Sequence, residues 1–309
     1  MKPFRKNVAI AIDGGGIKGA IVTRALSLLE EHLGQPSHHI FRLAAGTSTG
    51  SIISAGIGAG LTGAAMHRLY QDLGSTIFRK SWRTHLWPLS RYRYPIEPLK
   101  SALMRYIGNP TMGDLWKGES KTDVVITAFD LVTNHTCFIK PWKPKYAEWP
   151  LVQAILASSS VPTYFPVIDG RYVDGGVGAY SNPCYVAAYE ALFCLGWKPA
   201  DTTLISLGTG RAPHTLQPGE ANRFWTWDWI GPVLGAFLQS ADDQQVHLVH
   251  TFFQGFDFRR FQVDLREPIG MDDPLALPAL TLYGEDLARK ILNDETDPAM
   301  DITAMSVTR

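Results

Sequence analysis

The sequence predicts an α/β fold built on a mostly parallel sheet. Residues 7–12 form a continuous, largely apolar run, which is typical of a strand buried on both faces of a parallel sheet, and residues 203–207 are expected to form another strand. Segments with the apolar spacing of helices alternate with such runs, and several runs end in a glycine-rich turn. Ligands bind at the carboxyl ends of strands in these sheets, so we expect the functional residues in those turns.

The first half of the chain is expected to begin with a strand, a glycine loop and a helix that ends at Gly34. A second strand over residues 41–45 runs into a helix of small residues over 49–60. Together they complete a βαβ unit with a right-handed crossover. Three further elements are predicted, namely a helix opened by Pro95 and Pro98 and closed by Gly108, and paired strands at residues 123–129 and 137–140.

The second half continues the alternation. A helix begins at Pro150 and ends near Ser160, and Ser158, Ser159 and Ser160 are interpreted as loop residues that form hydrogen bonds rather than as catalysts. The remaining predicted elements are a strand at 171–173, a helix from Asn182 to Gly196, a strand at 203–207 with a tight turn at 208–210, a long helix at 232–253, a strand at 256–265 and a short helix at 283–292.

The composition is that of an ordinary globular protein. The 309 residues are 45% hydrophobic and 19% charged with zero formal net charge, so no long-range field favours a nucleic-acid polymer. Three cysteines without CxxC spacing argue against a disulfide framework or a zinc site. Asp13 interrupts the N-terminal apolar run, and the small-residue segment 44–66 is too polar to span a membrane. We expect a cytoplasmic protein without a transmembrane helix, metal or cofactor.

Ser48 lies in the pattern Gly46-Thr47-Ser48-Thr49-Gly50, at the end of the second predicted strand. In a Gly-x-Ser-x-Gly turn the flanking positions lack side chains because the turn is sharp, and the serine hydroxyl is left exposed. Ser48 is therefore the candidate nucleophile.

A glycine loop near the start of the chain offers an anion site. Gly14, Gly15 and Gly16 present consecutive backbone N–H groups that no side chain blocks. They precede a predicted helix, whose dipole favours an anion at its N-terminus. The loop is the candidate oxyanion hole.

Asp174 is the candidate base, in a turn where Gly175 and Gly176 leave room for close approach. No histidine has an obvious place near these turns, so the simplest hypothesis is a Ser48–Asp174 dyad that forms an acyl-enzyme. A carboxylate with a pKa of about 4 is a poor base, so we expect partial burial to raise the pKa of Asp174.

The three turns occur in the order and at the spacing of patatin-like phospholipases, and the chain resembles that family over about residues 8–210. The shared motifs are Asp13-Gly14-Gly15-Gly16-Ile17-Lys18-Gly19, Gly46-Thr47-Ser48-Thr49-Gly50 and Asp174-Gly175-Gly176. The resemblance implies a three-layer α/β/α fold, catalytic Ser48 and Asp174, and an oxyanion hole at residues 14–16. Lys18 stands where the family usually has arginine, which keeps the charge but loses bidentate hydrogen bonding.

The resemblance also implies a carboxylic ester hydrolase of phospholipase A or lysophospholipase type. Its substrate would be a phospholipid or another lipid ester, met during transient contact with a membrane. An activating ligand, for example a nucleotide signal, and a homo-oligomer are left open. We expect a catalytic core over residues 1–210 with a cap-like insertion at 75–110, and an extension at 211–309 packed on the same domain.

The insertion is basic and aromatic, with seven Lys or Arg from Arg79 to Arg105 against one acid, Glu97. It is interpreted either as a solvated surface or as a membrane-facing patch in which Arg79, Lys80 and Arg83 bind anionic headgroups. A second aromatic group, formed by Trp225, Trp227 and Trp229, is interpreted as packed in preference to lipid-anchoring.

Other classes fit parts of the sequence. Gly14-x-Gly16-x-x-Gly19 also fits a dinucleotide-binding loop, but the second strand ends at Ser48 rather than at the acid that would hold a ribose. An α/β-hydrolase with a Ser-His-Asp triad would use His247 or His250, although too few strands precede Ser48 for that fold. A ligand-gated, membrane-degrading effector on the patatin-like fold is a further alternative.

Overall fold

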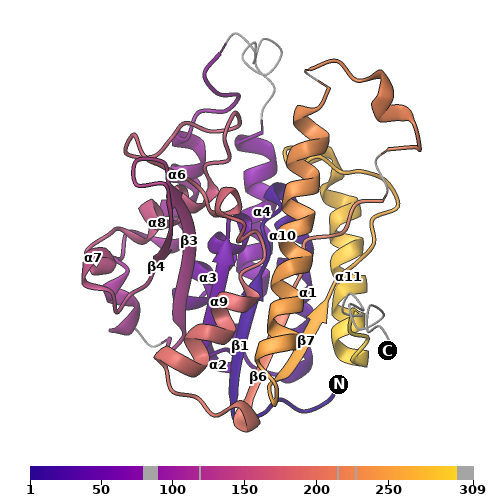
Figure 1. Ribbon diagram of the computed structural model, residues 1–309. Coiled ribbons are helices and arrows are strands. Elements are labelled where there is room, and N and C mark those ends of the chain that lie inside the picture. The colour runs from indigo at the N-terminus through magenta and orange to yellow at the C-terminus, as the bar shows by residue number, and fades with distance from the viewer. Residues whose placement is uncertain (79–89, 118–119, 214–215, 227, 298–309) are drawn as a thin grey trace, which may run out of the picture.

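The computed structural model describes residues 1–78, 90–117, 120–213, 216–226 and 228–297 (Figure 1). Within this part of the chain, one seven-stranded sheet has the order β4-β3-β2-β1-β6-β7, with β5 paired to β3. The strands are β1 (Asn7–Ile12), β2 (Leu43–Thr47), β3 (Asp123–Asp130), β4 (His135–Ile139), β5 (Tyr172–Asp174), β6 (Thr202–Leu207) and β7 (Asp257–Phe261). Only β4 and β5 run antiparallel to their neighbour β3. The predicted α/β class with a mostly parallel sheet is confirmed.

Helices cover both faces of this sheet. The α-helices are α1 (Gly19–Leu33), α2 (Ser37–Ile40), α3 (Thr49–Gly58), α4 (Gly63–Thr76), α6 (Glu97–Ile107), α7 (Pro144–Ala147), α8 (Leu151–Ser159), α9 (Cys184–Tyr189), α10 (Ile230–Phe252) and α11 (Leu277–Asn293). The shorter helical turns are η1 (Gly16–Lys18), η3 (Gly113–Trp116), η4 (Gly175–Gly178), η5 (Glu190–Cys194), η6 (Pro199–Asp201), η7 (Glu220–Arg223) and η8 (Pro274–Ala276).

Alternation along β1 divides the core into two layers. Ile10 and Ile12 point to the face packed by α1, α3, α4, α8 and α11, whereas Ala9 and Ala11 point to the face covered by α9 and α10. All six residues of β1 are buried, as expected for the middle of a parallel sheet. The result is the three-layer α/β/α arrangement of Figure 1.

Local signals explain where several helices begin and end. Gly34 ends α1 in the left-handed conformation, with φ of 67°. Glu30 accepts hydrogen bonds from the backbone amides of Ser37 and Gly63, both at 2.8 Å. One carboxylate of α1 therefore holds the N-termini of α2 and α4, and α4 forms a wall of the pocket described below.

The structure differs from the predicted elements in four places. The second strand begins at Leu43 rather than at residue 41. The helix α4 was not predicted, although Met66, Leu69 and Leu73 have helical spacing and are buried. The serines at 158 and 159 end α8 instead of lying in a loop. The last helix begins at Leu277 rather than at residue 283, because its one proline, Pro278, lies in the first turn, where no hydrogen bond is lost.

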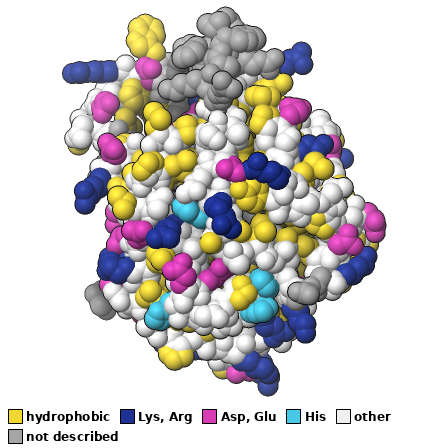
Figure 2. All heavy atoms as spheres, turned by 180° about the vertical axis from the view of Figure 1, so that it is seen from behind, with side chains coloured by type: hydrophobic (Ala, Val, Ile, Leu, Met, Phe, Trp, Pro, Cys, Tyr) yellow, Lys and Arg dark blue, Asp and Glu magenta, His cyan; other side chains and the backbone are white. Residues whose placement is uncertain are grey.

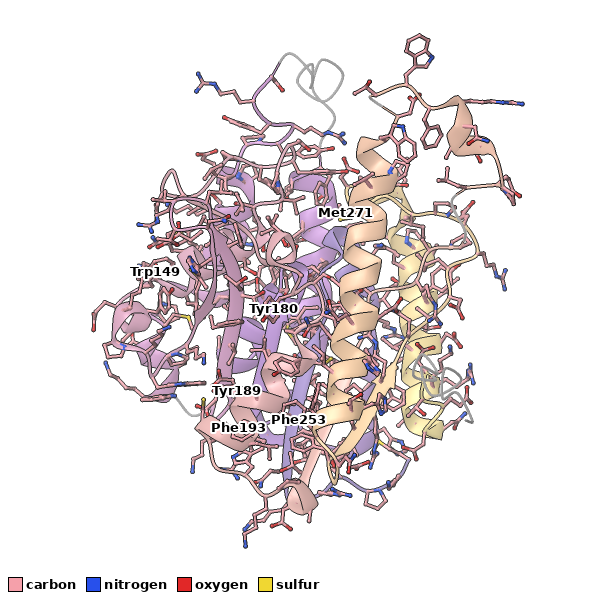
Figure 3. All side chains as sticks on the ribbon, viewed as in Figure 1. Trp149, Tyr180, Tyr189, Phe193, Phe253 and Met271 are labelled. Carbon is pink, nitrogen blue, oxygen red and sulfur yellow. The ribbon has the colours of Figure 1, made fainter. Side chains whose placement is uncertain are left out.

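The chain beyond residue 210 adds to the same sheet. Strand β7 pairs in parallel with β6, and α11 packs along α1. Phe253, which directly follows α10, packs against Phe193, and Phe193 in turn packs against Tyr189 (Figure 3). The division at residue 210 stays a prediction.

The two predicted surface features have different outcomes. Arg79, Lys80, Arg83 and Trp227 lie outside the described residues, so the membrane-patch interpretation stays a prediction. Trp225 is 81% exposed, so its interpretation as a packed residue was wrong. Its backbone amide donates a hydrogen bond to the Asp228 carboxylate at 2.8 Å, and the indole is exposed to solvent.

On the face shown in Figure 2, basic and acidic side chains are interspersed. No helix in the described ranges is long and apolar enough to cross a membrane. The same residues contain no cluster of His, Cys, Asp and Glu that would hold a metal.

Candidate active site

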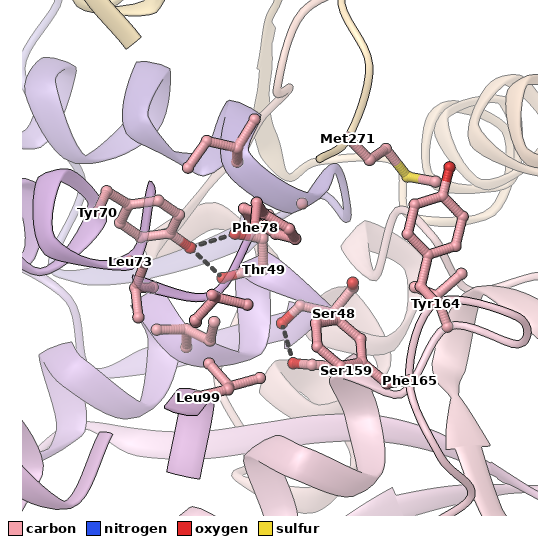
Figure 4. A pocket seen from close by; sticks show the side chains of 15 residues that line it. Ser48, Thr49, Tyr70, Leu73, Phe78, Leu99, Ser159, Tyr164, Phe165 and Met271 are labelled. Atoms are coloured by element: carbon pink, nitrogen blue, oxygen red, sulfur yellow. Dashed lines mark hydrogen bonds between the residues drawn. The ribbon is translucent and has the colours of Figure 1, made fainter. Parts of the chain in front are cut away.

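Ser48 joins β2 to α3 in a conformation that is rare for a residue with a side chain. Its φ is 55° and its ψ is −123°, which costs about 1–3 kcal/mol and has to be held by neighbours. Its amide donates to the hydroxyl of Ser158 at 2.9 Å, and its carbonyl accepts from the hydroxyl of Ser51 at 2.6 Å. The same carbonyl also accepts from the hydroxyl of Ser159 at 3.2 Å (Figure 4). The end of α8 thus supports the turn.

Close backbone packing surrounds this turn. A Cβ atom at Gly46 would lie 2.0 Å from the carbonyl oxygen of Gly50. A Cβ atom at Gly50 would lie 2.1 Å from the carbonyl oxygen of Ile12, at the end of β1. Both glycines let the strand turn directly into a helix against the neighbouring strand.

Asp174 ends β5, opposite Ala128 of β3. Since β3 also pairs with β2, the sheet brings Asp174 toward Ser48. The carboxylate is 5% exposed, and Oδ1 accepts from the amide of Gly176 at 2.8 Å. Gly175 lies against Thr127 of β3. The other oxygen, Oδ2, is buried and has no hydrogen-bond partner among the residues described.

Burial raises the pKa of Asp174 to about 6, and the Ser48 hydroxyl and the Gly176 amide partly offset that effect. At neutral pH most of the carboxylate is therefore ionised, and it is a stronger base than an exposed aspartate.

The glycine loop lies directly beside Ser48. A Cβ atom at Gly14 would lie 3.3 Å from the Ser48 Cβ. The amide of Gly14 already donates to the carbonyl of Ser181 at 2.8 Å, and the amide of Ile17 donates to the carbonyl of Met271 at 2.9 Å. We find no acceptor within the described part of the chain for the amides of Gly15 and Gly16.

Buried charges flank the loop. Asp13 forms a two-pronged ion pair with Arg260 of β7, and the Arg260 side chain also donates to the Ser206 hydroxyl at 2.8 Å. Burial lowers the pKa of Lys18, and the negative charge of Asp242 on α10 opposes that shift.

An apolar pocket that opens to solvent adjoins Ser48. Figure 4 shows Tyr164 and Met271 on one side of Ser48, and Tyr70 and Leu73 on the other. The lining comes from the glycine loop, α3, α4, α6, the end of α8 and two later loops, through Gly16, Ile17, Ser48, Thr49, Ile52, Tyr70, Leu73, Ile77, Phe78, Leu99, Ser159, Val161, Tyr164, Phe165 and Met271.

The glycine loop, Ser48 and Asp174 all fall within residues 10–188, which match the family model described as patatin-like phospholipase. The chain belongs to the patatin-like phospholipase family.

Relatives of this patatin-like chain carry phospholipase names. An intracellular phospholipase A2 of Caenorhabditis elegans is 29% identical over 223 residues, which cover 67% of this chain and 20% of that protein. A cGAMP-activated phospholipase of Pseudomonas aeruginosa is 26% identical over 264 residues, which cover 82% of this chain and 77% of that protein.

The patatin-like fold is also seen in a solved structure, that of VipD from Legionella pneumophila. It matches with a TM-score of 0.51 at 10% sequence identity, over 94% of this chain and 67% of that chain. At this identity the match concerns the fold.

The histidines of the triad alternative lie elsewhere in this patatin-like structure. His247 Nε2 is 3.3 Å from the Thr251 hydroxyl, one turn along α10. The His250 ring packs edge-on against Phe258. Neither contact involves Ser48 or Asp174.

Two residues that hold the site, Asp242 and Arg260, were given no role from the sequence, whereas Ser158 and Ser159 were predicted to form hydrogen bonds and Thr209 was predicted only as part of a tight turn. The signal for Arg260 is a charge inside an otherwise strand-like segment, which requires a buried partner. The signal for Thr209 is the turn at 208–210, whose threonine hydroxyl donates to the Gly14 carbonyl at 2.6 Å.

Proposed function

We propose that this protein is a lipid acyl hydrolase of phospholipase A or lysophospholipase type, which cleaves glycerophospholipid esters through Ser48 and Asp174. The observation that carries the proposal is the position of Ser48, on a strained turn between an apolar pocket and a buried carboxylate with a pKa of about 6.

In the first half-reaction Asp174 Oδ2 takes the proton of the Ser48 hydroxyl as Ser48 Oγ attacks the ester carbonyl carbon. The carbonyl oxygen becomes negative and accepts hydrogen bonds from the amides of Gly15 and Gly16, because the Gly14 amide is already bonded. The general base contributes on the order of 10²–10⁴ in rate, and each oxyanion donor about 10²–10³.

The tetrahedral intermediate then breaks its bond to the alcohol oxygen, which leaves with the proton held by Asp174. In the second half-reaction Asp174 removes a proton from water, which attacks the acyl-enzyme carbonyl carbon. Asp174 then returns this proton to Ser48 Oγ as the bond between Oγ and the acyl carbon breaks, which releases the fatty acid. Throughout, the acyl chain lies among the apolar side chains of the pocket, including Leu73 and Leu99.

Replacing Ser48 with alanine tests this proposal. We expect Ser48→Ala to lower kcat by roughly 10⁴–10⁶-fold while leaving the unfolding midpoint near that of the unchanged protein. Products released from a mixed phospholipid extract are identified by mass. Ser75→Ala, an exposed serine on α4, is the matched control. Ester cleavage that survives Ser48→Ala would refute the assignment.

We further propose that a nucleotide activator of the cyclic-dinucleotide class controls the activity. The support is the similarity to the cGAMP-activated phospholipase of Pseudomonas aeruginosa, which extends over 82% of this chain. Phospholipid hydrolysis is measured with and without cGAMP, and ATP serves as the control. We expect hydrolysis to rise with cGAMP alone; equal rates in the three conditions would remove this part of the proposal.

A further inference from the structure

The oxyanion donors proposed above depend on how two peptide groups of the glycine loop are oriented. The Gly14 carbonyl accepts from the Thr209 hydroxyl at 2.6 Å. In a trans peptide the C=O and N–H bonds point to opposite sides, so the Gly15 N–H points away from Thr209. The peptide group between Asp13 and Gly14 is held by the Gly14 N–H, which donates to the Ser181 carbonyl at 2.8 Å.

Ser181 is itself anchored by a residue far along the chain. Its hydroxyl donates to Asp242 Oδ1 on α10, and its side chain is buried. A continuous series of contacts therefore runs from Asp242 through Ser181 to Gly14 and on to the Gly15 amide. Tyr180, the residue before Ser181, lies beside α10 in Figure 3 and accepts at its carbonyl from the Thr47 hydroxyl, next to Ser48.

Charges from several elements act on Asp242. They are Asp13 after β1, Lys18 in η1, Arg260 in β7 and Asp243 on α10 itself; the Cys184 thiol at the start of α9, whose pKa is raised by burial, is a neutral member of the same group. Arg260 is already paired with Asp13. Lys18 is the remaining cation of this group, and its charge acts on Asp242.

We propose that Asp242 is a positioning residue, whose ionised carboxylate fixes Ser181 and thereby aims the Gly15 amide at the oxyanion. This inference rests on the proposed function, because it assumes that the glycine loop receives the oxyanion. The negative charge is essential to the role, since a hydrogen bond to a carboxylate is roughly twice as strong as one to a neutral acceptor.

Protonation of Asp242 weakens the Ser181 anchor and removes the negative charge that faces Lys18. Burial raises the pKa of Asp242 to about 8, and the charge of Asp13 adds to the shift. The rate constant kcat is therefore expected to rise twice with pH, first as Asp174 ionises near pH 6 and again as Asp242 ionises near pH 8.

The test is the pH profile of kcat on a soluble short-chain ester for Asp242→Asn, with Asp243→Asn as the matched control on the same helix. At pH 6.5 Asp242 is largely protonated in the unchanged protein, so we expect Asp242→Asn to have nearly the same kcat there. At pH 9 we expect the variant to be about tenfold slower, with KM unchanged and without the second rise. Asp242→Glu should keep the second rise, and Asp243→Asn should keep it at a somewhat lower pH, because the Asp243 charge raises the pKa of Asp242.

A second rise of kcat that persists in Asp242→Asn would overturn the inference. A loss of kcat by the same factor at every pH would also overturn it, because a general loss of folding gives that pattern. Ser48→Ala separates this from failure of the proposed function. If Ser48→Ala abolishes cleavage while Asp242→Asn keeps the full profile, only the role of Asp242 is wrong.

Discussion

Asp174 lowers the stability of the folded protein whenever it is ionised. Its pKa is about 6 in the folded state and 3.8 for an exposed aspartate, because burial disfavours the charge. Between these two values the folded state binds more protons than the unfolded state. The contribution of Asp174 to the free energy of unfolding is therefore fully present below pH 3.8. It decreases by about 3 kcal/mol in total as the pH rises through 6. A residue selected for stability alone would not be a buried carboxylate here.

We accordingly expect Asp174→Asn to make the protein more stable at pH 7.5, by about 1–3 kcal/mol, while removing ester hydrolysis. At pH 4 the two proteins should be nearly equal in stability. Urea unfolding at both pH values measures the difference. The exposed Asp201→Asn is the control and should change neither value. A destabilised Asp174→Asn at pH 7.5 would show that its carboxylate stabilises the fold.

A second residue-scale prediction concerns the pH dependence of the reaction itself. As a base, Asp174 has to be ionised, so kcat/KM should increase with pH through about 6 and should fall tenfold per pH unit below it. Initial rates on a soluble ester between pH 4.5 and 7 measure this limb. A rate that is already constant at pH 4.5 would exclude a base with this pKa.

At the scale of elements, buried strands were the easiest to predict, because a strand covered on both faces is largely apolar along its length. The strands at 7–12 and 203–207 were confirmed almost to the residue. The helix α4 was not predicted, since its first turn, Gly63-Ala64-Ala65, has no apolar spacing and lies within the small-residue segment 44–66. The apolar spacing of its later turns was nevertheless present in the sequence.

The residues that support the site were harder to predict because their partners are far away in the chain. Nothing close to Asp13 indicates its counter-ion, since Arg260 lies 247 positions later. Similarly, the role of Ser158 depends on contact with the amide of Ser48, 110 positions earlier. Such contacts arise from the topology of the sheet rather than from local pattern.

The ion pair between β1 and β7 gives an element-scale prediction. Both side chains are at most 6% exposed, so Arg260→Met leaves the Asp13 carboxylate buried and unpaired. We expect a loss of about 3–5 kcal/mol in unfolding free energy. Arg289→Met, which removes the exposed ion pairs of Arg289 with Asp286 and Glu295, should cost less than about 1 kcal/mol.

Denaturant unfolding at pH 7 measures both changes. The double variant Asp13→Asn with Arg260→Met should recover part of the loss, because the unpaired charge is gone. Equal effects of Arg260→Met and Arg289→Met would contradict a buried pair.

At the scale of the whole molecule, the site is built from both ends of the chain. The family match ends at residue 188, yet Arg260 neutralises Asp13 and the Met271 carbonyl holds the Ile17 amide. Strand β7 pairs with β6, and α11 packs along α1. The region after residue 210 is thus part of the scaffold that shapes the glycine loop.

We expect a chain that ends at residue 210 to lack a cooperative unfolding transition and ester hydrolysis. It would expose the pairing edge of β6 and the face of α1 that α11 covers, and would leave Asp13 without its cation. Circular dichroism during urea unfolding, with the full chain as the reference, measures this. A soluble 1–210 chain that unfolds cooperatively and cleaves esters would show an independent core.

The pairing of Asp13 with Arg260 also has a consequence for biosynthesis. Ser48 and Asp174 emerge from the ribosome long before Arg260 has been translated. Arg260 is the residue that pairs with Asp13, just before the glycine loop. The nascent polypeptide therefore carries its nucleophile for most of translation without a finished oxyanion site. In the proposed mechanism, ester hydrolysis begins only after β7 has been added, so the order of translation itself delays the reaction.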